Sequence, residues 1–254
     1  FRYTEWQESK MQLIDRACQI LTILSYQPEG MSVLELSEKI NLAPSTTHRI
    51  LASLKENKMV VQDQDSKKYR IGYKILSLCA NLNERNTLIT AAKPVMKQLS
   101  KLIDKTIVLC VMENTYIMNI ACIEKADSNL FLVKIGRELP LFSTSAGRVF
   151  CAFMDREKVH SVYESVHEQA LTPYTKTSWD ALCSEMDRVK ENGYACIDEE
   201  LQLGIKGYAC PIFDINGKVI AALAFLSTKA SLQDAEPMIR SLKESAKQIS
   251  TEIG

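Results

Sequence analysis

A run of hydroxyl and basic side chains, Ser-Thr-Thr-His-Arg at positions 45–49, carries groups able to do chemistry. Such residues cap helices, serve catalytic sites or hydrogen-bond to a partner. Pro44 suits the first position of a helix. The spacing i, i+3, i+4, i+7 then predicts a buried face formed by Thr47, Ile50, Leu51 and Leu54. The other side chains should face solvent: Ser45, Thr46, His48, Arg49 and Ser53.

The segments around this run predict a winged helix-turn-helix. Ser32 and Glu35 form a capping box for a preceding helix, and a short turn joins that helix to the one carrying the run. A β-hairpin with Lys67 and Lys68 at its tip follows, in the position of a wing. Ala43 is a poor N-cap, so the helix start should expose N–H groups that a phosphate would satisfy. We therefore expect residues 1–71 to contact DNA, although either lysine alone could be an ordinary exposed charge.

A second polar motif, Phe-Ser-Thr-Ser-Ala-Gly-Arg at positions 142–148, precedes another predicted helix. One interpretation is a tight turn in which Ser145 caps the helix and Gly147 packs closely. The other is that N–H groups at the helix start bind the carboxylate of a ligand. Arg137 and Arg148 could pair with such a ligand, and salt bridges explain them equally well.

Catalytic and metal-binding patterns are weak. Asp198, Glu199 and Glu200 are adjacent acids that more often form caps and ion pairs, and no nucleophile–base pairing or phosphate-binding loop accompanies them. His160 and His167 share a helix face but lie two turns apart, too far to bind one metal without other ligands. The eight cysteines lack C-x-x-C spacing, so we interpret them as reduced, mostly buried thiols. We expect no enzyme, no metal and no cofactor.

The composition limits the partners. The 254 residues suffice for one large or two modest domains, and 46% hydrophobic residues support a packed core. Lysine plus arginine balance aspartate plus glutamate at 31 each, so any DNA contact must come from a local patch. No apolar run approaches the ~20 residues of a membrane helix and no signal peptide is recognisable, so we expect a cytoplasmic protein with no membrane partner.

The chain changes its periodicity after a linking helix, which we assign to residues 72–86 with a stripe of Ile75, Leu78, Cys79 and Leu82. A longer helix follows with an apolar stripe of Leu88, Ala92, Val95, Leu99 and Leu102. Strands are predicted at 106–112, 116–123, 130–135, 194–197, 206–213 and 219–226, with helices between and after them. Asp214, Asn216 and Gly217 predict a hairpin. Residues 87–254 therefore read as an α+β domain with an antiparallel sheet.

The whole chain resembles the IclR family of bacterial transcription regulators. The resemblance rests on "DRACQILTIL", "MSVLELSEKINLAPSTTHRILASLKENKMVVQDQDSKKYRIGYKILSL", "LPLFSTSAGRVFCAF" and "NGYACIDEELQLGIKGYACPIFDINGKVIAALAF", in the family's order and spacing. It implies an N-terminal winged helix-turn-helix and a C-terminal GAF-like effector-binding domain. It also implies a homodimer or dimer of dimers that binds a double-stranded DNA operator and a small-molecule effector.

The resemblance also assigns residues to the two sites. It implies DNA contacts from the start of the recognition helix and from the wing: Ser45, Thr46, Thr47, His48, Arg49, Lys67, Lys68 and Tyr69. It implies an effector pocket bounded by the second polar motif on one side and by strand residues on the other: Ser145, Ala146, Gly147, Ile197, Asp198, Gly207, Ala224 and Leu226.

Three departures from the family pattern alter these expectations. Lys58 replaces a glycine that usually follows the recognition helix, and the left-handed turn is expected to shift onto Asn57. Gly207 replaces a common cysteine. Ile197, Ala224 and Leu226 stand where relatives that bind small oxo-acids carry polar ligands, so the pocket is expected to be larger or more apolar.

The leading hypothesis is a ligand-responsive repressor of a catabolic operon, released or re-oriented by an organic acid or aromatic metabolite. A transcriptional activator of the same family is the alternative. A small-molecule enzyme with a DNA-binding appendage is a third hypothesis, with Cys110 or Cys196 as its nucleophile. A winged helix that binds proteins instead of DNA is disfavoured because the exposed face of residues 45–49 is polar.

Overall fold

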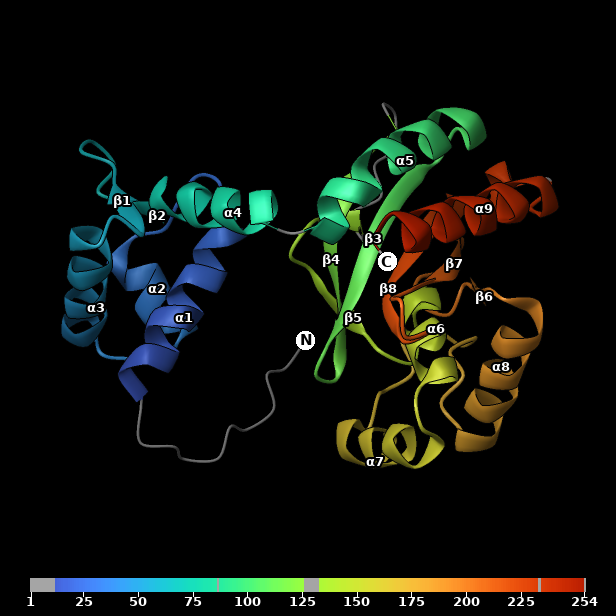
Figure 1. The fold of residues 1–254 in the computed structure, drawn as a ribbon. Coiled ribbons are helices and arrows are strands. Elements are labelled where there is room, and N and C mark those ends of the chain that lie inside the picture. The colour runs from blue at the N-terminus through green and yellow to red at the C-terminus, as the bar shows by residue number, and fades with distance from the viewer. Residues whose placement is uncertain (1–11, 86, 126–132, 233, 254) are drawn as a thin grey trace. The chain divides into compact units, whose positions relative to one another are not determined.

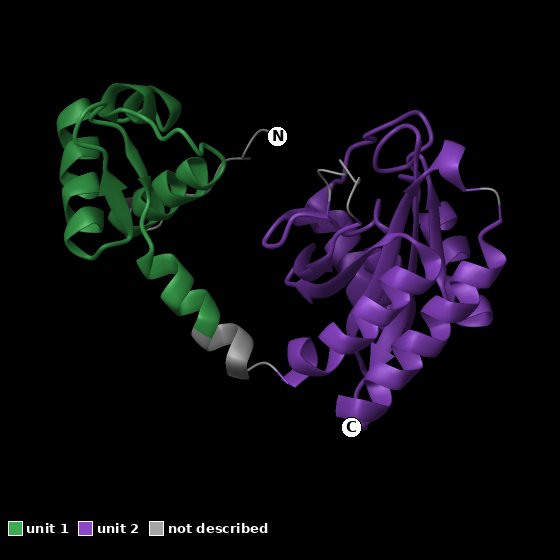
Figure 2. Ribbon diagram, turned by 90° about the horizontal axis from the view of Figure 1, so that it is seen from above, with its two compact units in different colours: residues 1–85 green, residues 86–254 purple. Residues whose placement is uncertain are grey.

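The computed structural model describes residues 12–85, 87–125, 133–232 and 234–253, and the chain divides into two compact units, residues 1–85 and 86–254. Figure 2 colours the two units. The first unit contains α1 (Gln12–Ser25), α2 (Val33–Lys39), α3 (Pro44–Glu56), β1 (Val60–Gln62), β2 (Tyr69–Ile71) and α4 (Lys74–Arg85). β1 and β2 pair as the antiparallel hairpin expected of a wing.

The core of the first unit explains why α2 and α3 adopt their places. The predicted capping box is present, because the Ser32 hydroxyl accepts from the Glu35 N–H at 3.3 Å while the Glu35 carboxylate accepts from the Ser32 N–H at 2.7 Å. The buried side chains come from α1, α2, α3, both strands and the residues flanking α2: Ile20, Leu24, Met31, Leu36, Ile40, Ile50, Leu51, Val60 and Tyr69. The periodic stripes of the three helices therefore meet in one cluster.

The second unit is built on an antiparallel sheet with the strand order β5-β4-β3-β8-β7-β6. Its helices are α5 (Thr87–Ile103), α6 (Ser145–Phe153), α7 (Arg156–Val166), α8 (Trp179–Asn192) and α9 (Glu236–Ile253). Its strands are β3 (Thr106–Glu113), β4 (Tyr116–Ile123), β5 (Glu138–Pro140), β6 (Ala195–Asp198), β7 (Ile205–Phe213) and β8 (Val219–Thr228), and the short 3-10 helix η2 (Lys229–Ser231) follows β8. This confirms the α+β prediction.

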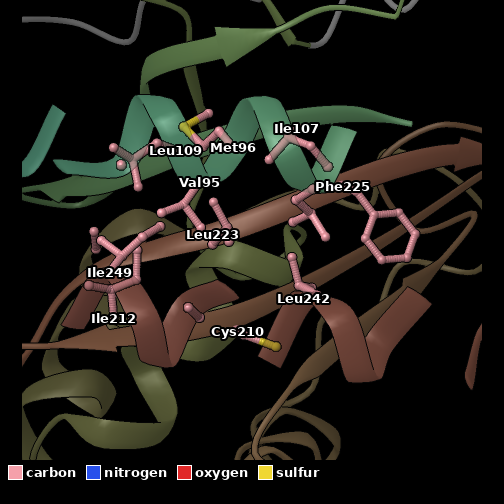
Figure 3. Close-up of a cluster of buried hydrophobic side chains, with 14 of the residues drawn as sticks. Val95, Met96, Ile107, Leu109, Cys210, Ile212, Leu223, Phe225, Leu242 and Ile249 are labelled. Atoms are coloured by element: carbon pink, nitrogen blue, oxygen red, sulfur yellow. The ribbon is translucent and has the colours of Figure 1, made fainter. Parts of the chain in front are cut away.

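The two faces of this sheet carry separate cores. α5 and α9 lie together on one face (Figure 1), where α5, α9 and strands β3, β7 and β8 contribute the side chains labelled in Figure 3. α6 and α8 cover the other face, over Val108 and Cys110 of β3 and Ala222 and Ala224 of β8. Successive strand residues point to opposite faces, so alternate residues of β3 and β8 divide between the two cores.

Some sequence predictions of the fold are wrong. Leu102 is 72% exposed, and Ile103 takes its place as the last buried residue of α5. The linking helix is present as α4, and Leu78 and Cys79 of its apolar stripe are exposed. Residues 130–132 of the predicted strand 130–135 lie outside the described residues, residues 133–137 form a turn region, and strand β5 follows at residues 138–140.

Candidate nucleic-acid interface and ligand pocket

The first turn of α3 presents the expected polar edge. Ser45, His48 and Arg49 are exposed, and Thr46 is half-buried. Ala43 makes no side-chain cap, although its carbonyl accepts the N–H groups of Thr46 and Thr47 at 3.0 Å each. Pro44 has no N–H, so the helix begins with its positive dipole end beside the exposed edge. Hydroxyl, imidazole and guanidinium groups are thus available to one anionic partner.

Thr47 and Tyr69 are corrections to the predicted DNA contacts, because both side chains are buried. Thr47 is fully buried, and its hydroxyl donates to the Ala43 carbonyl at 3.2 Å, within α3. Tyr69 is 2% exposed, and its backbone pairs with Met31, with N···O distances of 2.7 and 3.0 Å. Thr47 is buried because it lies on the apolar face of α3, and Tyr69 is part of the core of the first unit.

The wing tip combines two lysines with an internal ion pair. Lys67 is exposed and Lys68 is half-buried. Asp63 accepts from the N–H and hydroxyl of Ser66 at 2.9 and 2.8 Å, and these hydrogen bonds lower the pKa of Asp63. Arg70 approaches Asp63 at 3.5 Å, so part of the acidic charge of the wing is balanced within the wing. Lys67 and Lys68 remain as the basic groups of the tip.

The turn after α3 does not shift as expected. Lys58 itself adopts the left-handed backbone with φ +60°, whereas Asn57 has φ −79° and ends the helix. The Met59 N–H bonds to the Leu54 carbonyl and the Met59 carbonyl accepts from the Gly72 N–H, at 2.9 and 2.8 Å. These bonds fix the turn at Lys58, and a β-carbon at Gly72 would lie 2.3 Å from the Lys58 carbonyl oxygen.

The ligand pocket predicted in the second unit lies between the start of α6 and the α6-facing side of the sheet. Five of the eight predicted effector residues line it: Ser145, Ala146, Ile197, Ala224 and Leu226. Its other lining residues are Val108, Cys110, Ile117, Asn119, Leu139, Thr144 and Leu201. The cavity measures about 30 Å³, room for about one or two water molecules. The lining of this small pocket is mostly apolar, in line with the apolar alternative of the prediction.

The remaining three predicted residues lie outside the lining, for different reasons. A β-carbon at Gly147 would lie 1.7 Å from the Leu141 carbonyl oxygen, so this glycine permits close packing. Gly207 lies just behind the lining, where a β-carbon would come within 3.3 Å of the Ser145 hydroxyl. Asp198 instead pairs with Lys206 at 2.8 Å and with Lys229 at 3.3 Å.

The start of α6 resembles an anion site. Thr144, rather than Ser145, is the N-cap, and its hydroxyl accepts from the Gly147 N–H at 3.1 Å and donates to the Pro140 carbonyl at 3.0 Å. Among the described residues, no acceptor is bonded to the N–H groups of Ser145 and Ala146, both of which line the pocket. Unpaired N–H groups at a helix start favour a negatively charged ligand.

Sequence reasoning missed a polar pair on the opposite wall. The Cys110 sulfur lies 3.3 Å from the Asn119 side-chain oxygen, and the Asn119 amide donates to the Lys134 carbonyl at 3.3 Å. A register shift between Leu109 and Cys110 places Cys110 opposite Asn119. The sequence did contain one signal. Asn119 lies two residues from Ile117 and from Ala121, so strand alternation places this polar side chain on their buried face.

The thiols proposed as nucleophiles are poorly suited to that role. Burial raises the pKa of Cys110 to about 12. Burial also raises the pKa of Cys196, more than its hydrogen bond with Tyr208 lowers it. Because the thiolate is the reactive form, neutral buried thiols do not support the enzyme hypothesis.

Arg148 pairs with protein carboxylates and does not line the pocket. It is 2% exposed and bonds to the carboxylate of Glu200, to Glu185 at 3.5 Å, and to the carbonyls of Phe142 and Cys196 at 3.3 and 3.2 Å. Burial alone would raise the pKa of Glu200, but the hydrogen bond and charge of Arg148 outweigh it and lower that pKa. This network joins α6 to α8 and to the residues after β6.

The other acids and the histidines also have structural partners. Lys229 donates a hydrogen bond to the Glu199 carboxylate at 2.6 Å, which lowers the pKa of Glu199. Asp198 pairs with Lys206 and Glu200 with Arg148, so the three adjacent acids form ion pairs, as expected. His160 packs edge-on against Trp179, with ring centroids 4.6 Å apart, and His167 ends α7. Within the described ranges, no group of three metal-ligating side chains comes together, and no helix is long and apolar enough to span a bilayer.

Comparison with known proteins covers both units. The IclR helix-turn-helix domain model matches residues 13–64, and the bacterial transcriptional regulator IclR C-terminal model matches residues 80–251. The chain is 33% identical over 237 residues to the HTH-type transcriptional regulator KdgR of Escherichia coli strain K12, covering 92% of this chain and 90% of that protein. It is 32% identical over 248 residues to the DNA-binding transcriptional repressor YiaJ of the same strain, covering 96% and 88%.

A solved structure shows the same fold. It is an IclR homolog from Microbacterium hydrocarbonoxydans complexed with 4-hydroxybenzoate, with a TM-score of 0.81, 22% identity, and coverage of 95% of this chain and 98% of that chain. The curated relatives KdgR and YiaJ are transcriptional regulators, in agreement with the prediction that the chain is not an enzyme.

Proposed function

The chain belongs to the IclR family of bacterial transcription regulators, and we propose that it is a repressor that dissociates from its operator when it binds an organic acid. The observation that carries the DNA-binding part is the exposed edge of Ser45, His48 and Arg49 at the start of α3. The name of the relative YiaJ supports repression rather than activation. Such a regulator would act in the bacterial cytoplasm, where the chromosome lies.

The DNA mode follows from the positions of these side chains. α3 enters the major groove, where Arg49 and the hydroxyls of Ser45 and Thr46 meet phosphates and base edges. Lys67 and Lys68 of the wing meet the backbone beside it. The formal net charge of the chain is zero, so affinity depends on doubling the contacts in a homodimer or dimer of dimers, with recognition helices about 34 Å apart. Leu76 and Leu78 of α4, 63% and 47% exposed, support a role for that helix in pairing two copies.

The effector mode uses the start of α6. The N–H groups of Ser145 and Ala146 hold the carboxylate, and the apolar walls, including Ile197 and Leu226, surround the body of the molecule. A pocket of about 30 Å³ does not admit such an acid as it stands, so binding must enlarge it by moving part of its wall, such as the start of α6 or the segment of Leu201. The 4-hydroxybenzoate bound to the Microbacterium homolog supports an aromatic or similar acid. For the acid to control DNA binding, it must bind the DNA-free arrangement of the regulator more tightly than the DNA-bound one. Such coupling free energies are typically about 1–3 kcal/mol.

The test is capture of genomic DNA fragments by the purified full chain, with and without organic acids. We expect a small set of fragments that is released by one acid or a group of related acids. Capture of no fragment above background at low salt would contradict DNA binding. Capture that no acid changes would contradict only the effector part of the proposal.

A further inference from the structure

A second hollow in the second unit lies at the opposite end of α6 from the effector pocket. It measures about 590 Å³, within the range of about 300–1,000 Å³ that small-molecule pockets occupy. Its walls come from the end of β3, the end of α6, the start of α7 and the start of β8: Met112, Asn114, Phe150, Phe153, Met154, Asp155, Lys158, Lys218, Val219 and Ile220. We refer to these residues as the α6 groove.

The floor of the α6 groove is apolar and partly open to water. Phe153 is 39% exposed and packs edge-on against Phe213, with ring centroids 5.2 Å apart. Met112 and Met154 are half-buried, and Phe150 is buried beneath them. An apolar ligand that covered these side chains would gain from the removal of their surface from water.

The charged groups of the α6 groove are unbalanced. Lys158 and Lys218 are exposed, and neither forms an ion pair within the described part of the chain. The carboxylate in the lining, Asp155, is the N-cap of α7 and accepts from the N–H groups of Glu157 and Lys158 at 3.0 and 3.2 Å. The groove therefore combines two exposed lysines with apolar side chains, which is complementary to a molecule with a carboxylate and an extended hydrocarbon body.

We propose that the α6 groove is a second ligand site, separate from the pocket at the helix start, for an organic carboxylate with an extended apolar body. Lys158 and Lys218 hold the carboxylate, and Phe150, Phe153 and the two methionines contact the hydrocarbon. α6 lines both sites, with Ser145 and Ala146 at one end and Phe150 and Phe153 at the other. A ligand in the groove would thus contact the same helix that lines the first pocket.

Titration calorimetry of the full chain with sodium octanoate tests the charge requirement. We expect octanoate to bind and octanol, which lacks the charge, to bind more weakly. The double variant Lys158→Gln/Lys218→Gln should weaken octanoate binding about tenfold, the effect of two exposed charge contacts. The matched control, Lys190→Gln/Lys247→Gln, removes two exposed lysines from α8 and α9 and should bind like the parent chain. No octanoate binding, or equal binding by both double variants, would overturn the proposal.

Methionine methyl NMR locates the bound acid. Octanoate should shift the signals of Met112 and Met154, assigned with Met→Leu variants, and leave those of the core residues Met96 and Met186 in place. Octanoate in the first pocket could also shift Met112 and Met154 through α6, so the same spectra are recorded for Lys158→Gln/Lys218→Gln. Shifts that this double variant leaves unchanged at equal octanoate concentration would place the acid outside the groove and contradict the assignment. A change of oligomeric state in Phe153→Glu, together with no octanoate shift in the parent chain, would identify the groove as an interface between copies instead.

Discussion

The Arg148→Met variant tests how the second unit holds its pocket helix. Arg148 is 2% exposed, and its loss removes the charge that faces Glu200, itself 2% exposed. It also removes the donors to the carbonyls of Phe142 and Cys196. Breaking a buried pair from one side costs about 3–5 kcal/mol, and the partial compensation of Glu200 by Lys176 at 3.4 Å places the expected loss near the lower end of that range.

Urea unfolding followed by circular dichroism measures this loss, and Arg156→Met provides the matched control. Arg156 pairs with Asp187 at 2.5 Å, but both side chains are substantially exposed, so its removal should cost less than about 1 kcal/mol. The lowered pKa of Glu200 means that its stabilising contribution is complete above its unfolded-state pKa and is lost as the pH falls through the lower folded-state pKa. In Arg148→Met, the free energy of unfolding should therefore fall less steeply as the pH is lowered through this range. Equal costs for the two arginine variants, or an unchanged acid profile, would refute the reasoning.

Four further substitutions test other parts of the account. Lys58→Gly should stabilise the first unit by about 0.5–1 kcal/mol in thermal unfolding, because φ +60° suits glycine; a loss of stability would contradict the assigned turn. Gly147→Ala should cost about 3 kcal/mol or more, since its β-carbon would meet a backbone oxygen at 1.7 Å, and an unchanged unfolding midpoint would show that this close approach is not present. Gly207→Cys and Ala224→Ser should alter the acid concentration that releases DNA while leaving DNA affinity without acid unchanged, and a fall in that affinity would assign both residues a structural role.

Much of the first unit was predictable from the sequence because its signals are local. The capping box, the proline after Ala43 and the helical apolar spacing determine α2 and α3 within a few residues. Where two local signals conflicted, the apolar stripe was the better guide, as for Thr47, which belongs to both the stripe and the polar run. The turn at Lys58 was mispredicted because left-handed preference is weak compared with the hydrogen bonds that fix the chain there.

The linking helix and the second unit show what sequence patterns cannot predict. Periodicity identifies an apolar stripe but not its partner, so α4 carries a regular stripe whose Leu78 is exposed. At the end of α5, Leu102 and Ile103 are both apolar, and only the packing distinguishes them. The opposition of Cys110 and Asn119 depends on a register shift between neighbouring strands, which neither strand indicates alone.

The most direct test of the central claim is the salt dependence of operator binding by Arg49→Ala, measured by fluorescence anisotropy on a captured fragment. If the exposed edge of α3 binds DNA phosphates, the variant should bind more weakly, and the slope of log K against log salt should flatten by about one for each phosphate that the variant no longer neutralises. Affinity and slope equal to those of the parent chain would show that this edge of α3 does not face DNA.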